Sequence, residues 1–129
     1  MKHPEPADLL QEILTRDPRY TVEAYAFVRD GLEFTVRRLD ETRHVSGQEL
    51  TAGLRDYALE EFGPMGKTIL NGWGIERTED FGEIVFNMVE TGLLGKTEDD
   101  SRTDFANGYD FDEAFRRPFQ PAAAPPPGS

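Results

Sequence analysis

The feature that most constrains the fold is the spacing of apolar residues between positions 7 and 92, where they recur at intervals of three and four. Apolar residues at that spacing lie on one face of an α-helix and predict a buried stripe. Glycine and proline interrupt the pattern repeatedly, and these residues end helices or begin turns. The sequence therefore predicts a mostly α fold with about five helices, over residues 7–15, 21–40, 46–63, 64–74 and 78–92.

Polar residues mark where three of these helices are expected to begin. Ser46 and Glu49 have the spacing of a capping box, in which each side chain accepts a backbone N–H of the other residue. Thr21 and Thr78 stand directly before apolar stripes and are candidate N-caps. The stripe predicted for the second helix comprises Tyr25, Val28, Leu32, Val36 and Leu39.

The periodic pattern ends after Gly92. Leu93 and Leu94 are followed by a polar run that reaches Thr103, and this arrangement fits two short strands joined as a β-hairpin. Tyr109, Phe111, Phe115 and Phe119 then follow at intervals that match neither strand nor helix throughout. We therefore expect an irregular aromatic C-terminal arm.

The last residues have a different composition. Five of the nine prolines lie between residues 118 and 127, and proline at this density allows neither a helix nor a central strand. The sequence therefore predicts a single helical domain over residues 1–117 and a disordered Pro/Ala-rich tail over residues 118–129.

The net charge of −11 is distributed unevenly along the chain. Residues 16–55 hold seven acidic and seven basic residues, whereas residues 56–113 hold fifteen acidic residues and four basic ones. Nucleic-acid affinity depends on Lys and Arg, which release counterions from phosphates. The second half of the chain is therefore expected to repel DNA.

Residue types exclude several further classes. The chain has no cysteine and two histidines, His3 and His44, so a structural zinc site lacks ligands. The N-terminus has no signal-peptide pattern and no segment is apolar enough to span a membrane, which favours a cytoplasmic location. His44 is a candidate general base, but a loop histidine before a capped helix is more often structural. No cofactor motif and no catalytic residue is assigned.

Three groups of residues are candidate sites. Arg29, Arg37, Arg38 and Arg43 could form a basic strip for RNA or an acidic partner, although interleaved carboxylates at helical spacing also suit self-paired surface charge. Phe115 and Phe119, with the other C-terminal aromatics, either pack on the chain's own core or form a hook for a partner, and we favour the core. The third group is acidic.

Asp110, Asp112 and Glu113 form this acidic cluster. Carboxylates are the ligands that Mg²⁺ and Ca²⁺ prefer, but the spacing lacks the Gly-centred twelve-residue calcium loop. A solvated acidic loop explains the cluster equally well. No metal is therefore assigned to it.

Residues 48–105 resemble a winged helix-turn-helix. Trp73-Gly74-Ile75 followed by Thr78 stands where that family has the turn before its recognition helix, and Gly92-Leu93-Leu94 resembles the start of its wing. The recognition helix, however, carries four carboxylates where major-groove contacts require cationic or amide side chains; they belong to Glu79, Asp80, Glu83 and Glu90. The resemblance implies the fold without its usual DNA-binding role.

The chain is also similar, over roughly residues 8 to 116, to an uncharacterised bacterial protein family. The similarity is carried by the segments HVSGQEL, EFGPMGKT, WGI, TEDFGEIVFNMVETGLL and YDFDEAF. It implies no activity and no catalytic residues.

Together, these observations favour a non-catalytic protein-interaction or regulatory module that binds a protein partner or a second copy of itself. One alternative is a nucleic-acid or ribosome-associated factor that uses the arginine strip. The other is a small divalent-metal-dependent enzyme. DNA and membranes are not expected partners.

Overall fold

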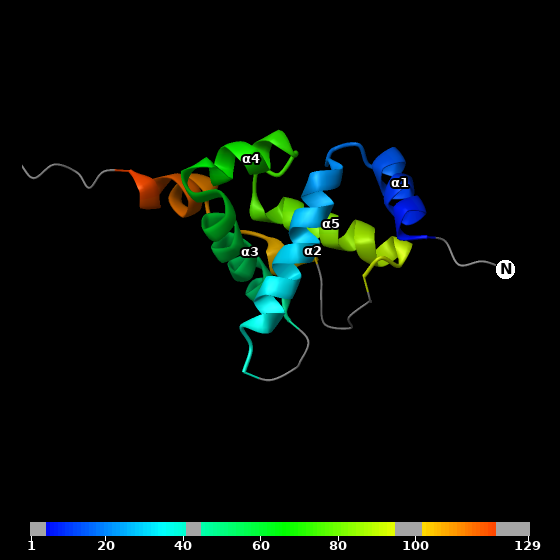
Figure 1. Ribbon diagram of the computed structural model, residues 1–129, viewed down its shortest axis with the longest axis horizontal. Helices are drawn as coiled ribbons and strands as arrows, with labels where there is room; N and C mark the ends of the chain where they lie inside the picture. The colour runs from blue at the N-terminus through cyan, green and yellow to red at the C-terminus, as the bar shows by residue number, and fades with distance from the viewer. Residues whose placement is uncertain (1–4, 41–44, 95–101, 121–129) are drawn as a thin grey trace, which may run out of the picture.

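A computed structural model describes residues 5–40, 45–94 and 102–120 (Figure 1). The prediction of a mostly helical fold is confirmed. The five α-helices are α1 (Pro6–Arg16), α2 (Val22–Arg37), α3 (Gly47–Phe62), α4 (Gly66–Gly72) and α5 (Thr78–Thr91). Four short turns accompany them, namely the 3-10 turns η1 (Gly63–Met65), η2 (Arg102–Phe105) and η4 (Arg117–Phe119) and the π-helical turn η3 (Asp112–Arg116).

Local hydrogen bonds at the helix starts explain why most predicted boundaries hold. The Thr21 side chain accepts the N–H of Ala24 at the start of α2. Ser46 and Glu49 form the reciprocal capping box of α3. Both caps satisfy backbone donors that the first turn of a helix leaves unpaired.

The prediction that Thr78 caps α5 is wrong. Thr78 is the first residue of the helix, and its buried hydroxyl accepts the N–H of Gly108. The Asp80 carboxylate serves the helix start instead, because it accepts the N–H groups of Glu76 and Arg77. The hydroxyl of Thr78 therefore ties the C-terminal arm to α5.

α2 lies between α3 and α5, α1 packs on one end of α5, and α4 packs on α3 (Figure 1). The ring of Phe27 on α2 is the centre of an aromatic cluster. It lies between 5.4 and 6.3 Å, centroid to centroid, from the rings of Tyr57, Phe62, Trp73 and Phe81. Aromatic pairs at these separations stabilise a core beyond the area they bury.

The buried face of α2 is wider than the predicted stripe. Tyr25 and Val28 of the stripe are buried, whereas Val36 is 36% exposed, and Gly31 and Thr35 are buried as well. The reason is a close approach of α2 to α3. A Cβ atom on Gly31 would lie 2.3 Å from a methyl carbon of Leu54, and one on Gly53 would lie 1.9 Å from the Thr35 hydroxyl oxygen. Gly31 and Gly53 thus allow the two helices to approach closely along this face, and the spacing of large apolar residues does not indicate such a contact.

The predicted β-hairpin after Gly92 is not supported. The described residues contain no strand: Gly92 to Leu94 form a turn and bend, and residues 102–105 form η2, while residues 95–101 lie outside the description. The physical reason is packing. The Phe105 ring lies directly over Gly82 of α5, where a Cβ atom would be only 3.0 Å from it. The segment therefore runs along α5 as one helical turn instead of extending as a wing.

The C-terminal arm packs mainly on the chain's own core. Phe105, Phe111 and Phe115 are 1%, 4% and 0% exposed. Pro118 and Phe119, which the sequence assigned to the tail, form η4. The rest of the predicted tail, residues 121–129, lies outside the described residues.

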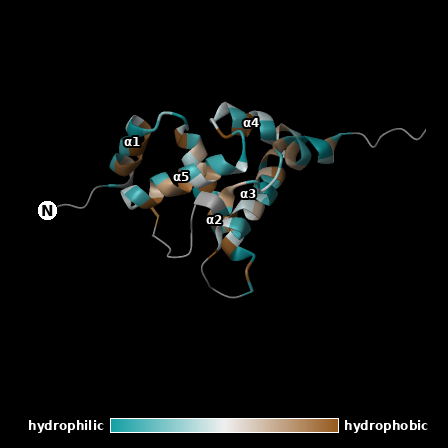
Figure 2. Cartoon of the chain, turned by 180° about the vertical axis from the view of Figure 1, so that it is seen from behind, coloured by the Kyte–Doolittle hydropathy of each residue, from teal (hydrophilic) through white to brown (hydrophobic). Residues whose placement is uncertain are grey.

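Each helix carries both hydrophobic and hydrophilic residues (Figure 2). Four large hydrophobic side chains remain exposed among the described residues: Val22 (46%), Val36 (36%), Met65 (52%) and Phe119 (44%). Single exposed apolar residues are ordinary on a protein surface. Val22 lines a groove, and Met65 and Phe119 lie on two turns that contact each other.

Candidate functional site: an apolar groove between α1, α2 and α5

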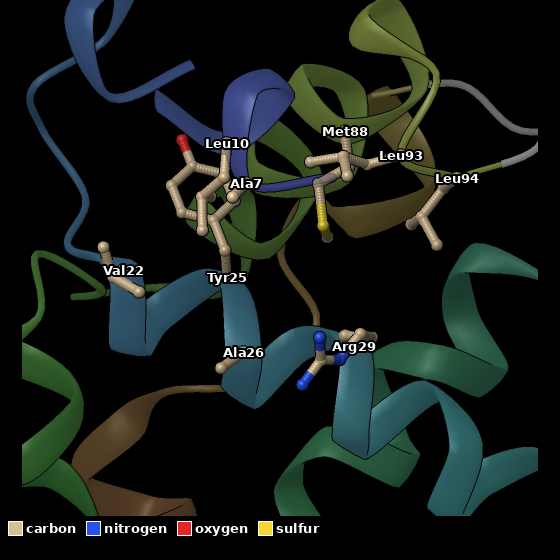
Figure 3. A pocket seen from close by; sticks show the side chains of 9 residues that line it. All are labelled: Ala7, Leu10, Val22, Tyr25, Ala26, Arg29, Met88, Leu93 and Leu94. Atoms are coloured by element: carbon tan, nitrogen blue, oxygen red, sulfur yellow. The ribbon is translucent and has the colours of Figure 1, made fainter. Parts of the chain in front are cut away.

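Val22 lies at the edge of a groove of about 320 Å³ that α1, α2 and the end of α5 enclose (Figure 3). Its volume falls at the lower end of the roughly 300–1,000 Å³ found for ligand pockets. The lining residues are Ala7, Leu10, Val22, Tyr25, Ala26, Arg29, Met88, Leu93 and Leu94. We call this surface the α1–α2–α5 groove.

The groove is hollow because two of its positions carry alanine. Ala7 on α1 and Ala26 on α2 each present only a methyl group to the groove, whereas the other lining residues of these two helices carry larger side chains. Leu93 and Leu94 form the far wall. They are turned back across the end of α5 by Gly92, which has φ +89°, and by a 3.1 Å hydrogen bond from the Leu94 N–H to the Met88 carbonyl.

Among the residues that the structure describes, Arg29 is the one cation that lines the groove. Its side chain is 68% exposed and forms an ion pair of 3.4 Å with the neighbouring Asp30. Exposed pairs at this distance contribute little free energy, so most of the donor capacity of the guanidinium stays available. The described part of the groove is therefore an apolar surface with a single positive charge at its edge.

A polar network supports the groove from behind. The Asn87 amide donates to the Tyr25 hydroxyl at 3.0 Å and to the Asp17 carboxylate at 2.9 Å. Arg19 binds Asp17 through two hydrogen bonds of 2.8 and 2.7 Å and reaches Glu83 at 3.3 Å. Burial raises the pKa of Tyr25. The network joins the α1–α2 connection to α5 and fixes the Tyr25 ring in the groove wall.

Acid is expected to weaken this network. The hydrogen bonds from Arg19 hold the pKa of Asp17 well below its usual range. Because the unfolded chain takes up this proton more readily, the stability that Asp17 contributes is complete above about pH 4 and is lost as the pH falls further. Asp17→Asn should cost about 1–3 kcal/mol at neutral pH. Urea unfolding at several pH values should show the gap between wild type and variant closing in acid, and a constant gap would contradict the assignment.

The structure places the predicted arginine strip among carboxylates. Arg37 pairs with Glu33 on the same helix, and Arg38 pairs with Asp56 of α3 at 2.9 Å. Arg43, like His44, lies outside the described residues. An RNA-binding role for the strip stays a prediction, and Arg29 of the strip lines the α1–α2–α5 groove.

The acidic cluster is used within the chain. Asp110 accepts the N–H groups of Asp112 and Glu113 at 2.8 and 3.2 Å, and so caps the turn that follows. Asp112 pairs with Lys67 at 2.6 Å, and this contact lowers its pKa. Glu113 reaches Arg117 at 3.4 Å. Over the described ranges, no three acidic or histidine side chains gather as a metal site would require.

Phe115 and Phe119 have different environments. Phe115 is fully buried, with its ring 4.9 Å from that of Phe111, so in this fold it offers no surface to a partner. Phe119 is 44% exposed. The two residues, which the sequence groups together, are therefore separated into a core residue and a surface residue.

A second hollow of about 340 Å³ lies between α3 and the segment from Asp104 to Tyr109. Arg55 is its cation, but its Nε pairs with Asp56 at 3.2 Å and its guanidinium lies 5.9 Å from the centre of the Tyr109 ring. The Tyr109 hydroxyl donates to the Thr51 carbonyl at 2.9 Å. The Asp104 carboxylate accepts a hydrogen bond from the Gln48 amide at 3.2 Å. Both charged residues that line this hollow thus have partners within the chain, and the hollow defines no ligand class.

The α1–α2–α5 groove was missed in the sequence although a signal was present. Val22, Ala26 and Arg29 follow each other at steps of four and three, which places them on one helical face. That second stripe of α2 indicates a surface with both apolar and cationic character. Leu93 and Leu94 lie after Gly92, outside any helical stripe, so the sequence does not indicate that they line the same surface.

Comparison with protein-family models, with characterised proteins and with solved structures finds no match. Across the described ranges, none of the helices combines the length and apolar character needed to cross a bilayer. The geometry of the groove is therefore the main basis for a functional proposal.

Proposed function

We propose that the chain is a non-catalytic protein-interaction module and that the α1–α2–α5 groove is its docking surface. The observation that supports this is an apolar hollow of about 320 Å³ with one exposed arginine at its edge. Protein interfaces combine an apolar centre with arginine and aromatic residues in this way. Val22, which is 46% exposed, supplies such apolar contact area.

The occupant we propose is a short amphipathic helical segment of another protein. Helices dock in apolar grooves through side chains spaced three and four residues apart. Two or three such side chains would fill the space above Ala7 and Ala26. A carboxylate on the same segment would pair with Arg29, because guanidinium and carboxylate form bidentate hydrogen bonds.

The charge of the whole chain limits how acidic this segment can be. A net charge of −11 repels a strongly acidic partner at a distance. One carboxylate aligned with Arg29 satisfies the local requirement without that long-range cost. The partner segment is therefore expected to be apolar, with a single acidic residue and neutral or basic flanks.

The test uses two variants within the groove and one outside it. Ala26→Trp fills the hollow, Arg29→Glu reverses its charge, and Arg37→Glu reverses an exposed charge on the same helix outside the groove. The wild-type chain is used to capture partners from lysate, and the affinity of each variant for the captured protein is then measured. We expect Ala26→Trp to abolish binding, Arg29→Glu to weaken it at least tenfold, and Arg37→Glu to leave it unchanged.

Circular dichroism melting checks that the three variants remain folded. Equal binding by wild type and Ala26→Trp would overturn the proposal. A nuclease-sensitive complex that Arg37→Glu disrupts as strongly as Arg29→Glu would overturn it too, in favour of the RNA-binding alternative.

A further inference from the structure

A second exposed apolar surface lies at the opposite end of the molecule from the groove. Met65 of η1 and Phe119 of η4 are 52% and 44% exposed, and their two turns are in contact with each other. We call these two residues the terminal patch. Each follows a proline, Pro64 or Pro118, in its short 3-10 turn, so each is presented on a conformationally restricted backbone.

Two acidic residues precede the patch on the α3 side. Glu60 and Glu61 are exposed in the last turn of α3, which contains no basic residue. Carboxylates at a helix C-terminus face the negative end of the helix dipole, where a cation would be favourable. In the part of the chain that the structure describes, neither carboxylate forms an ion pair. The C-terminal end of α3 thus carries two negative charges without a cation from the described chain to balance them.

Two basic residues precede the patch on the other side. Arg116 and Arg117 are 57% and 72% exposed and stand directly before Pro118 and Phe119. Their partners within the chain, Asp112 and Glu113, lie at 3.5 and 3.4 Å. Exposed pairs of this length are weak, so both guanidinium groups can bind a second carboxylate.

We propose that the terminal patch binds a second copy of this chain. A two-fold axis brings the same surface of two copies together, so a surface that carries both a donor and its acceptor complements itself. The patch supplies an apolar centre, and Arg116 and Arg117 of one copy pair with Glu60 and Glu61 of the other, twice over. The proposal is independent of the α1–α2–α5 groove, which lies elsewhere on the molecule.

Charge reversal tests this pairing directly. One variant carries Glu60→Arg with Glu61→Arg, and the other carries Arg116→Glu with Arg117→Glu. Each variant alone would set like charges against like charges across the axis, whereas a mixture of the two restores opposite charges at both contacts. Sedimentation equilibrium of the full chain is measured over micromolar to millimolar concentrations, for the wild type, each variant and their equimolar mixture.

We expect a concentration-dependent dimer for the wild type, at least tenfold weaker association for each variant, and recovery in the mixture. Phe119→Ala should weaken the dimer at least tenfold, and this single exposed substitution keeps the test valid if a charge variant fails to fold. A wild type that stays monomeric at millimolar concentration would overturn the proposal, as would a mixture that fails to recover. Loss of the dimer in Ala26→Trp but not in Phe119→Ala would also overturn it, because the groove would then be the interface.

Discussion

Phe115→Ala is expected to lower the free energy of unfolding by about 3–5 kcal/mol. The side chain is fully buried, and its ring lies edge-on to Phe111 at 4.9 Å and to Tyr109 at 5.9 Å. It also lies against Gly66 at the start of α4. Since small domains are stable by only about 5–15 kcal/mol, this loss is a large share of the total. Thermal melting should show a decrease of roughly 10–20 °C.

Phe119→Ala is the matched control. The same chemical change four residues later removes a side chain that is 44% exposed, and surface substitutions usually alter stability by less than about 0.5 kcal/mol. A similar loss of stability in both variants would show that η4 belongs to the core. A small loss for Phe115→Ala would show that the arm does not pack as described.

Gly74→Ala is expected to cost about 3–5 kcal/mol, for two reasons that act together. Gly74 has φ +95°, a conformation that residues with a Cβ atom rarely adopt. A Cβ atom there would also lie 2.0 Å from the backbone carbonyl oxygen of Arg19. That oxygen belongs to a segment held by the two Arg19–Asp17 hydrogen bonds and by the Tyr20–Asp80 bond of 2.6 Å. The backbone therefore cannot move aside easily.

Gly72→Ala provides the comparison, two residues earlier. Gly72 is the last residue of α4, and a Cβ atom there would meet no atom within 4 Å. Alanine is favoured over glycine in a helix by about 1 kcal/mol, so this variant should be unchanged or slightly more stable. Urea unfolding of both variants measures the difference. Equal stability would mean that the α4–α5 connection does not touch the α1–α2 connection.

The helices could be predicted from the sequence because their determinants are local. The Ser46 capping box, the Thr21 cap and the stop at Gly92 each involve residues within one turn of each other. Thr78 was misassigned for the opposite reason. Its hydroxyl is used by Gly108, thirty residues away along the chain, and no local pattern indicates such a contact.

The wall that Leu93 and Leu94 add to the groove and the position of Phe105 depend on tertiary packing, which the sequence alone does not indicate. Leu93 and Leu94 have the composition of a strand start, but in the structure they form a bend, and the Phe105 ring packs directly against Gly82 of α5. The buried face of α2 is wider than the sequence predicts, because Gly31 and Gly53 allow a closer contact between α2 and α3 than large apolar residues do. At the α5–arm contact and at the α2–α3 contact, a glycine leaves room for the side chain that packs against it.

The position of the aromatic arm in the chain has a consequence for how the protein is made. Phe105, Phe111 and Phe115 complete a core to which α3, α4 and α5 contribute, yet they are synthesised after all five helices. Domains fold as units during translation, so this core cannot close until the arm has left the ribosomal exit tunnel. A nascent chain stalled before Phe105 would expose the apolar faces of its helices, and chaperones would be needed to protect these faces until the arm emerged.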